Sequence, residues 1–258
     1  MGTVAAVSFR GAWVDRATPI RDQTRQIYDS LQTLLNAWNP DSELSRLTST
    51  NDWPQHVSPE VRPCYAKAFE LMAESAGAFN PLLSEKLRRA GQTRRSALVD
   101  LGAIAKGFAV DCAYAALRAA SEERPDDAQA GLLLDLGGNL RAVAGSWRVG
   151  VKDPNHTGLV ARVVLQPGEA LATSATYVRG AHILDGRTGQ VVSNQVASVT
   201  VLASDAMTAD GLSTLFFVLG PTEGERFLSA HPAYAAVSVL WVLLDGTMRG
   251  AGRAARFE

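Results

Sequence analysis

Hydrophobic and polar residues follow two periodicities along this chain. Apolar residues spaced three or four positions apart indicate a helix over residues 20–37. Shorter apolar runs bounded by turn residues indicate strands. We expect these strands at residues 4–9, 132–135, 147–151, 160–165, 170–173, 198–202 and 237–244. Further helices are expected at residues 58–77, 103–120 and 205–219, and over a short stretch that ends before His231.

Two of these helices carry sequence signals for their first turn. Ser58 followed by Pro59 is typical of an N-cap and the first helical position. Thr222 and Glu225 have the spacing of a capping box. Because helices and strands do not alternate strictly, the pattern favours an α+β fold over a doubly wound parallel sheet.

Composition narrows the class of protein. The 258 residues include 25 basic and 26 acidic side chains. This near-neutral balance lacks the excess of basic residues that is typical of proteins that bind nucleic acid. No run approaches the roughly 20 apolar residues needed to span a bilayer. The opening segment lacks the basic and long apolar regions of a secretory signal, so we expect a cytoplasmic protein. In that compartment Cys64 and Cys112 are expected to be small core residues.

A first candidate site lies at residues 100–107, where a carboxylate and a glycine lead into a helix. Free N–H groups at the helix start, with Lys106 about one turn later, suit a phosphate or another anion. Asp100 can accept hydrogen bonds from a nucleobase or a ribose. An ordinary helix start with an acidic cap and a solvated lysine explains the same residues.

Glycine-rich and polar turns form two further candidates. Residues 132–139 lead a buried strand into a Gly-Gly pair, which favours either a tight turn or close backbone approach to a ligand. In the segment 181–189, His182 is a candidate base near neutral pH, and Arg187 can pair with phosphate. A hairpin turn at residues 185–186 accounts for this segment equally well.

The last candidate is a pair of oxygen ligands. Asp210 and Thr214 are spaced so that they share one face of a helix. A carboxylate and a hydroxyl are hard ligands, and Mg²⁺ is usually held by one or two such groups with phosphates and waters completing its shell. The same spacing also occurs in a helix with nothing more than a polar stripe.

The order of these segments is more specific than any one of them. The series comprises residues 1–3, 39–47, 77–81, 100–107, 135–139, 172–174, 182–189 and 210–214. It resembles the ApbE family, the FAD:protein FMN transferases, over nearly the whole chain. The resemblance implies a single α+β domain over residues 1–258, with mixed or antiparallel sheets flanked by helices in a T-fold-like arrangement.

The resemblance also implies a reaction. The expected enzyme depends on Mg²⁺, cleaves FAD at its pyrophosphate and attaches FMN through a phosphoester bond to a threonine of a target flavoprotein, releasing AMP. His182 is similar to the base that takes the proton of the acceptor threonine. The implied metal ligands are the backbone carbonyl of Ala103 and the side chains of Asp210 and Thr214. The implied FAD contacts are Met1, Trp38, Ala78, Phe79, Asn80, Asp100 and Lys106. Aromatic rings at Trp38 and Phe79 would suit stacking on the flavin or adenine.

Several positions depart from the family pattern. Gly186 stands where the family usually has proline, which predicts a more flexible loop. Asn80 replaces an aspartate, Trp38 replaces a tyrosine, and residues 175–177 read Ala-Thr-Tyr instead of Gly-Asp-Tyr. The segment between Pro81 and Asp100 is short for the family, which predicts less cover over FAD.

Two other functions use the same residues. With water in place of threonine as the acceptor, the protein would be a Mg²⁺-dependent FAD pyrophosphatase. A non-catalytic flavin-binding homologue is favoured by the short, polar region 84–96. The presence of His182, Lys106, Asp210 and Thr214 argues against it, because storage of a flavin requires no base.

Overall fold

A seven-stranded antiparallel sheet lies at the centre of the computed structural model, which describes residues 3–47, 56–84, 97–122, 129–175, 183–253 and 256–258. Its strand order is β1-β2-β3-β6-β7-β8-β9. These strands are β1 (Ala5–Arg10), β2 (Gly131–Leu136), β3 (Asn139–Ala144), β6 (Ala170–Ala175), β7 (Val196–Ala203), β8 (Ser238–Leu243) and β9 (Met248–Gly252). The remaining strands, β4 (Trp147–Lys152) and β5 (Leu159–Leu165), pair with each other as a separate antiparallel ribbon.

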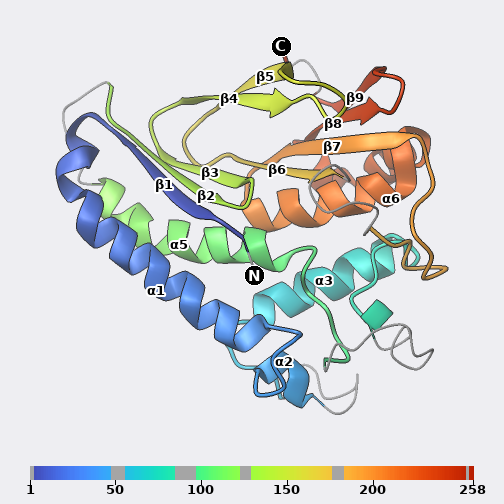
Figure 1. Ribbon diagram of the computed structural model, residues 1–258, viewed down its shortest axis with the longest axis horizontal. Helices are drawn as coiled ribbons and strands as arrows, with labels where there is room; N and C mark the ends of the chain where they lie inside the picture. Colours follow the sequence, from blue (N-terminus) through green and yellow to red (C-terminus); the bar gives the residue numbers. More distant parts are fainter. Residues whose placement is uncertain (1–2, 48–55, 85–96, 123–128, 176–182, 254–255) are drawn as a thin grey trace.

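The helices gather on one side of this sheet. They are α1 (Ala17–Leu35), α2 (Glu43–Arg46), α3 (Arg62–Glu74), α5 (Ala105–Glu122) and α6 (Ala206–Ala230), with short 3₁₀ helices at Gly11–Arg16 and Pro232–Tyr234. Figure 1 shows α1, α5 and α6 below the sheet and the β4–β5 ribbon above it. The expected α+β class, with antiparallel sheets flanked by helices, is confirmed.

Apolar residues cover both faces of the sheet. The larger cluster lies between the sheet and the helices, where Leu132, Leu134 and Leu136 alternate along β2 to face α5. A smaller cluster joins the outer face to the β4–β5 ribbon. Every residue of β7 is buried, as expected for a central strand covered on both sides.

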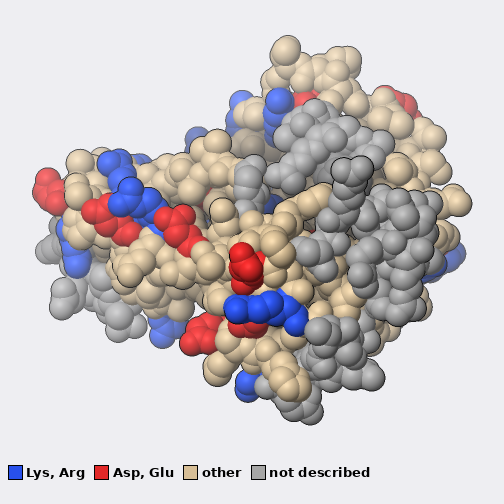
Figure 2. Space-filling view, turned by 60° about the horizontal axis from the view of Figure 1, so that its bottom comes forward, with Lys and Arg blue, Asp and Glu red and all other residues tan. Residues whose placement is uncertain are grey.

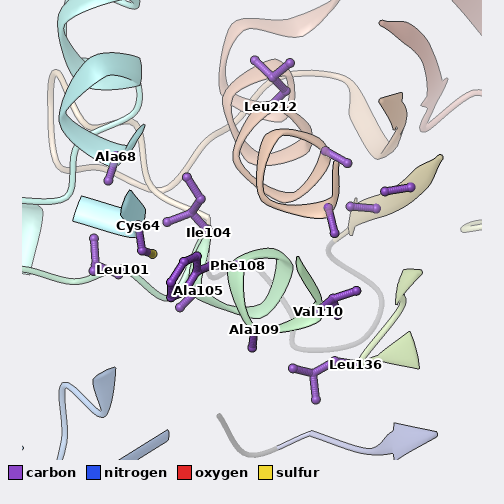
Figure 3. Packing of buried hydrophobic residues seen from close by; sticks show 14 of the residues in the cluster. Cys64, Ala68, Leu101, Ile104, Ala105, Phe108, Ala109, Val110, Leu136 and Leu212 are labelled. Atoms are coloured by element: carbon purple, nitrogen blue, oxygen red, sulfur yellow. The ribbon is translucent and has the colours of Figure 1, made fainter. Parts of the chain in front are cut away.

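The segment that leads into α5 ties three helices together. Ile104 packs between α3 and α6, beside Cys64 and Ala68 (Figure 3) and against Gly211, where a Cβ would lie 3.2 Å from the Ile104 side chain. Cys64 is a free, buried thiol, and burial raises its pKa well above the usual range, so it is a core residue, as predicted. This packing fixes the start of α5 relative to α6.

Several elements differ from the sequence-based expectation. The strands β3 and β9 were not predicted. The third helix begins at Arg62 rather than at Ser58, whose carbonyl accepts hydrogen bonds from the amides of Val61 and Arg62 in the preceding turn. The helices expected at residues 205–219 and before His231 are the two parts of α6, because the chain leaves helical geometry at Gly220, where φ is 68° and ψ is 177°. The second part begins at Pro221, so Gly220 precedes it rather than the predicted cap Thr222.

The Gly-Gly pair forms the turn between β2 and β3. Gly137 and Gly138 have φ values of 62° and 86°, which suits the two-residue hairpin turns that favour glycine. Asp135 accepts a hydrogen bond from the Gly138 amide at 2.8 Å. Of the two interpretations of this segment, a tight turn or close approach to a ligand, the structure shows the tight turn.

Charged residues are interspersed on the surface seen in Figure 2, where acidic and basic side chains alternate in small groups. Among the described residues, no helix combines the length and the apolar character that crossing a bilayer would require.

Candidate functional site

The candidate site lies where the start of α5 meets the first turns of α6. Gly107 makes this approach possible, because a Cβ at this position would lie 2.1 Å from the carbonyl oxygen of Ala206 and 2.8 Å from Cβ of Asp210. Both distances are far below van der Waals contact, and the nearest obstacle is backbone. Glycine is therefore the residue that allows α5 and α6 to come this close.

An ion pair joins the two helices at this point. Lys106 Nζ lies 2.9 Å from Oδ1 and 3.1 Å from Oδ2 of Asp210, although the two residues are 104 positions apart in the chain. The Gly107 amide donates to Asp210 Oδ2 at 2.9 Å. Side-chain exposure is 21% for Lys106 and 6% for Asp210, so the pair is largely shielded. Lys106 is thus not the freely solvated lysine of the ordinary helix-start interpretation.

Three hydroxyl groups lie beside this pair. Ser174, near the end of β6, has its Oγ 2.8 Å from Ser213 Oγ and 3.2 Å from Thr214 Oγ1. Ser213 also donates to the main-chain carbonyl of Asp210 at 2.9 Å. Strand β6 therefore helps to orient the Thr214 hydroxyl on the same helix face as Asp210. Sequence reasoning missed Ser174 and Ser213; the signal available was their position within the 172–174 segment and beside Thr214.

The donors at this place suit a magnesium ion. A carboxylate offers about four acceptor positions, and Lys106 and Gly107 use three of them on Asp210, which leaves one on Oδ1. Thr214 adds a hydroxyl, and Ala103 lies in the turn directly before α5. In the described part of the chain no three or more His, Cys, Asp or Glu side chains cluster as a metal site. A hard ion held by one carboxylate and neutral oxygens would need further oxygens, such as phosphates, to complete its shell.

The predicted flavin wall and the turn after His182 are packed together. The Gly186 amide donates to the carbonyl of Ala78, and Asn80 Nδ2 donates to the carbonyl of Gly186, both at 3.1 Å. A Cβ on Gly186 would lie 2.3 Å from the Gly77 carbonyl oxygen. Gly186 is therefore closely packed against this wall, and the geometry gives no sign of the flexible loop that its replacement of proline predicted.

Other predicted FAD contacts are spread around this region. The Asp100 amide donates to the carbonyl of Pro81 at 2.7 Å, and its side chain accepts from the Gly102 amide at 2.9 Å. Phe79 is 4% exposed and belongs to the core, so in this structure its ring offers no face for stacking. Trp38 is 63% exposed and presents its ring to the surface. Met1 and His182 lie outside the described residues, so the predicted base has no described position.

Arg187 is engaged by carboxylates. Its guanidinium contacts Asp185 at distances down to 2.7 Å and Glu223 at 3.3 Å. The hydrogen bonds from Arg187 hold the pKa of the Asp185 carboxyl below its usual range. The suggested pairing of Arg187 with phosphate would have to compete with these two acids.

A comparison of the sequence with known proteins identifies its relatives. The model of the ApbE family matches residues 1–96 and 84–238. A FAD:protein FMN transferase of Rhodobacter capsulatus is 39% identical over 162 residues, which cover 58% of this chain and 29% of the relative. The corresponding protein of Vibrio cholerae is 33% identical over 147 residues, covering 52% of this chain and 42% of the relative. The chain thus matches less than half the length of either.

Solved structures show the same fold. The flavin transferase ApbE of Vibrio cholerae is similar with a TM-score of 0.76 and 23% identity, covering 99% of this chain and 95% of that one. The ApbE protein of Thermotoga maritima gives a TM-score of 0.77 with 25% identity, covering 96% and 93%. Together with the family model, which spans well over half of the sequence, this places the chain in the ApbE family.

Proposed function

We propose that this protein is a Mg²⁺-dependent FAD:protein FMN transferase. The relatives named above carry this activity in their names. The observation that carries the proposal is the contact of Lys106 with Asp210, beside the hydroxyls of Thr214 and Ser174. Three segments far apart in the sequence thus supply a cation, a carboxylate and hydroxyl groups to one place. These groups suit a diphosphate and a hard metal ion.

The proposed reaction exchanges one bond for another at phosphorus. The hydroxyl oxygen of the acceptor threonine forms a bond to the phosphorus of the FMN half of FAD. The bond between this phosphorus and the bridging oxygen breaks, and AMP leaves with that oxygen. The threonine proton passes to His182, the base implied by the resemblance. Such a transfer depends on positioning and charge neutralisation, and it requires no covalent enzyme group.

Other residues of this chain would bind FAD and the metal ion and neutralise charge. Lys106 would neutralise charge on the diphosphate. Asp210, Thr214 and the Ala103 carbonyl would hold Mg²⁺, which supplies further positive charge when bound. Ser174 and Ser213 would keep the Thr214 hydroxyl oriented. Asp100, Trp38, Met1 and the 78–80 segment would line the FAD pocket, with Ala78 and Phe79 contributing main-chain atoms because their side chains are buried.

The test combines FAD, MgCl₂ and a candidate acceptor flavoprotein with the enzyme. We expect release of AMP and a flavin that remains on the acceptor after denaturation, seen by fluorescence and intact mass. The substitution His182→Ala should lower the rate about 10²- to 10⁴-fold, the usual contribution of a general base, while FAD binding persists. His156→Ala is the matched control, because His156 is an exposed residue of the turn after β4.

Other outcomes identify the alternatives. Release of FMN and AMP without an adduct would identify a pyrophosphatase for that acceptor. Binding of FAD without any consumption in the presence of Mg²⁺ would identify a non-catalytic flavin-binding protein.

A further inference from the structure

The carboxylate proposed to hold the metal already holds a cation. Lys106 Nζ contacts both oxygens of Asp210, at 2.9 and 3.1 Å. The Asp210 side chain is only 6% exposed, so water screens the pair poorly. In the protein without ligands, the positive charge at this carboxylate is therefore supplied by the chain itself.

The other donors at this place are neutral. Thr214, Ser174 and Ser213 contribute hydroxyl groups, which are joined to one another by hydrogen bonds. A divalent ion on Asp210 would have to share one negative charge with the ammonium of Lys106. Two cations beside a single shielded carboxylate repel each other, so Lys106 in its present position opposes metal binding.

FAD offers Lys106 another partner. A lysine ammonium sits at the end of a flexible four-carbon stem and readily serves as a point charge for phosphate. If the diphosphate of FAD draws Lys106 away from Asp210, the carboxylate becomes free for the metal. The proposed function supplies the premise that FAD and Mg²⁺ share this site.

We propose that Lys106 is an internal counter-ion that occupies the charge of Asp210 until FAD arrives, so that FAD and Mg²⁺ bind cooperatively. By thermodynamic linkage, FAD tightens Mg²⁺ binding by the same factor by which Mg²⁺ tightens FAD binding. Lys106 is then both a contact for the diphosphate and the residue that keeps metal affinity low in the empty site.

This role differs from two simpler ones in a measurable way. A lysine that only contacts phosphate would have no influence on metal binding in the absence of FAD. A lysine that only stabilises the fold would, when removed, weaken the binding of both ligands. A counter-ion, when removed, leaves Asp210 unoccupied and strengthens metal binding to the FAD-free protein.

The experiment measures Mg²⁺ affinity by calorimetry, without FAD, for the wild type and for Lys106→Met. We expect Lys106→Met to bind Mg²⁺ about tenfold more tightly, within the 5- to 150-fold range typical of coupling between sites, and to bind FAD more weakly. Lys106→Arg keeps the charge and should retain the low metal affinity of the wild type. Lys67→Met is the matched control, because Lys67 is a similarly shielded lysine that pairs with a carboxylate, Glu70, within α3.

An unchanged or lower Mg²⁺ affinity of folded Lys106→Met in the absence of FAD would overturn the proposal. Thermal unfolding checks that each variant is folded, and Lys106→Gln provides a second neutral side chain. If neither neutral variant folds, the test is to measure the Mg²⁺ affinity of the wild type with and without saturating FAD. Equal affinities would contradict the proposed cooperativity. Failure of the wild type to bind FAD at all would instead contradict the proposed function. The comparison of Mg²⁺ affinity between the wild type and Lys106→Met without FAD would still test the role of Lys106.

Discussion

Gly107 shows how one residue without a side chain sets the distance between two helices. Its amide reaches Asp210 directly, and its Cα lies so close to α6 that a Cβ would meet the Ala206 carbonyl. Gly211 presents a different case, because a Cβ there would meet the ends of the Leu71 and Ile104 side chains, which can move. The two glycines therefore differ in what surrounds them.

We predict that Gly107→Ala lowers the free energy of unfolding by about 1–3 kcal/mol, the usual cost of overpacking, because backbone must shift. Gly211→Ala should be close to neutral, since the gain of about 1 kcal/mol in helix propensity offsets the side-chain rearrangement. Urea denaturation of both variants measures the difference. Equal effects of the two substitutions would contradict the assignment of Gly107 to the helix contact.

The candidate site residues could be picked out from the sequence one by one, but the ion pair between Lys106 and Asp210 could not. The 100–107 and 210–214 segments made Lys106 and Asp210 candidates, because a lysine at a helix start suits an anion and a carboxylate with a hydroxyl one turn later suits a metal, although an ordinary helix start and a polar stripe explained the same residues. They were assigned to different ligands, however. Only the approach of α5 to α6 brings their charges together, and no local pattern encodes a contact across 104 positions.

Helices α5 and α6 are joined a second time, at Asp111. This side chain accepts hydrogen bonds from the Ala206 and Met207 amides, both at 2.8 Å, and pairs with Arg141 of β3 at 2.6 Å. Arg141 also stacks on Tyr114, with its guanidinium carbon 3.6 Å from the ring centre. Asp111 thus satisfies amides at the start of α6 that a helix leaves unpaired.

Burial gives Asp111 a distinct pH dependence. It raises the pKa of this carboxyl, although Arg141 and the two amides act in the opposite direction. The folded protein therefore binds more protons here than the unfolded chain, whose Asp pKa is about 3.9. Stability from this group is present below that value and decreases as the pH rises through the folded-state pKa.

We predict that Asp111→Ala destabilises the protein by about 3–5 kcal/mol, because it leaves Arg141 without its buried partner and two amides uncapped. The difference from the wild type should be larger near pH 4 than at pH 7, following the direction of the pKa shift. Denaturant titrations at both values measure it. Asp22→Ala is the control, since its pair with Arg25 is exposed and should contribute less than about 1 kcal/mol.

Most elements could be read from the sequence, and the two missed strands show why the rest could not. Strand β3 follows immediately after the Gly-Gly turn and includes Asn139 and Arg141, so it lacks a clear apolar run. Strand β9 contains two glycines and is mostly exposed. Both owe their conformation to pairing with a neighbour, β2 and β8 respectively, more than to their own residues.

The molecule has three layers, with the helices on one side of the central sheet and the β4–β5 ribbon on the other (Figure 1). Leu165 of β5 is fully buried against Leu171 and Leu202 of the sheet. The ribbon and the α5–α6 contact therefore lie on opposite faces of the same sheet. Stability and ligand binding should respond separately to changes in these two layers.

We predict that Leu165→Ala costs about 2–5 kcal/mol of stability, the usual range for a buried leucine, while the affinities for FAD and Mg²⁺ remain unchanged in conditions where the variant is folded. Leu159→Ala, on the same strand but half exposed, should change stability by less than about 0.5 kcal/mol. Denaturation and calorimetry separate the two effects. A loss of FAD affinity in folded Leu165→Ala would show that the layers are coupled.

The tip of the β4–β5 ribbon offers a point of attachment. His156, Thr157 and Gly158 are exposed there, and such tips accept inserted sequence more readily than other parts of a fold. A fluorescent reporter or an affinity handle spliced between Thr157 and Gly158 would project away from the helical layer. The protein could then be anchored to a surface, with its helical face left open to solution for single-molecule tests of the proposed flavin transfer.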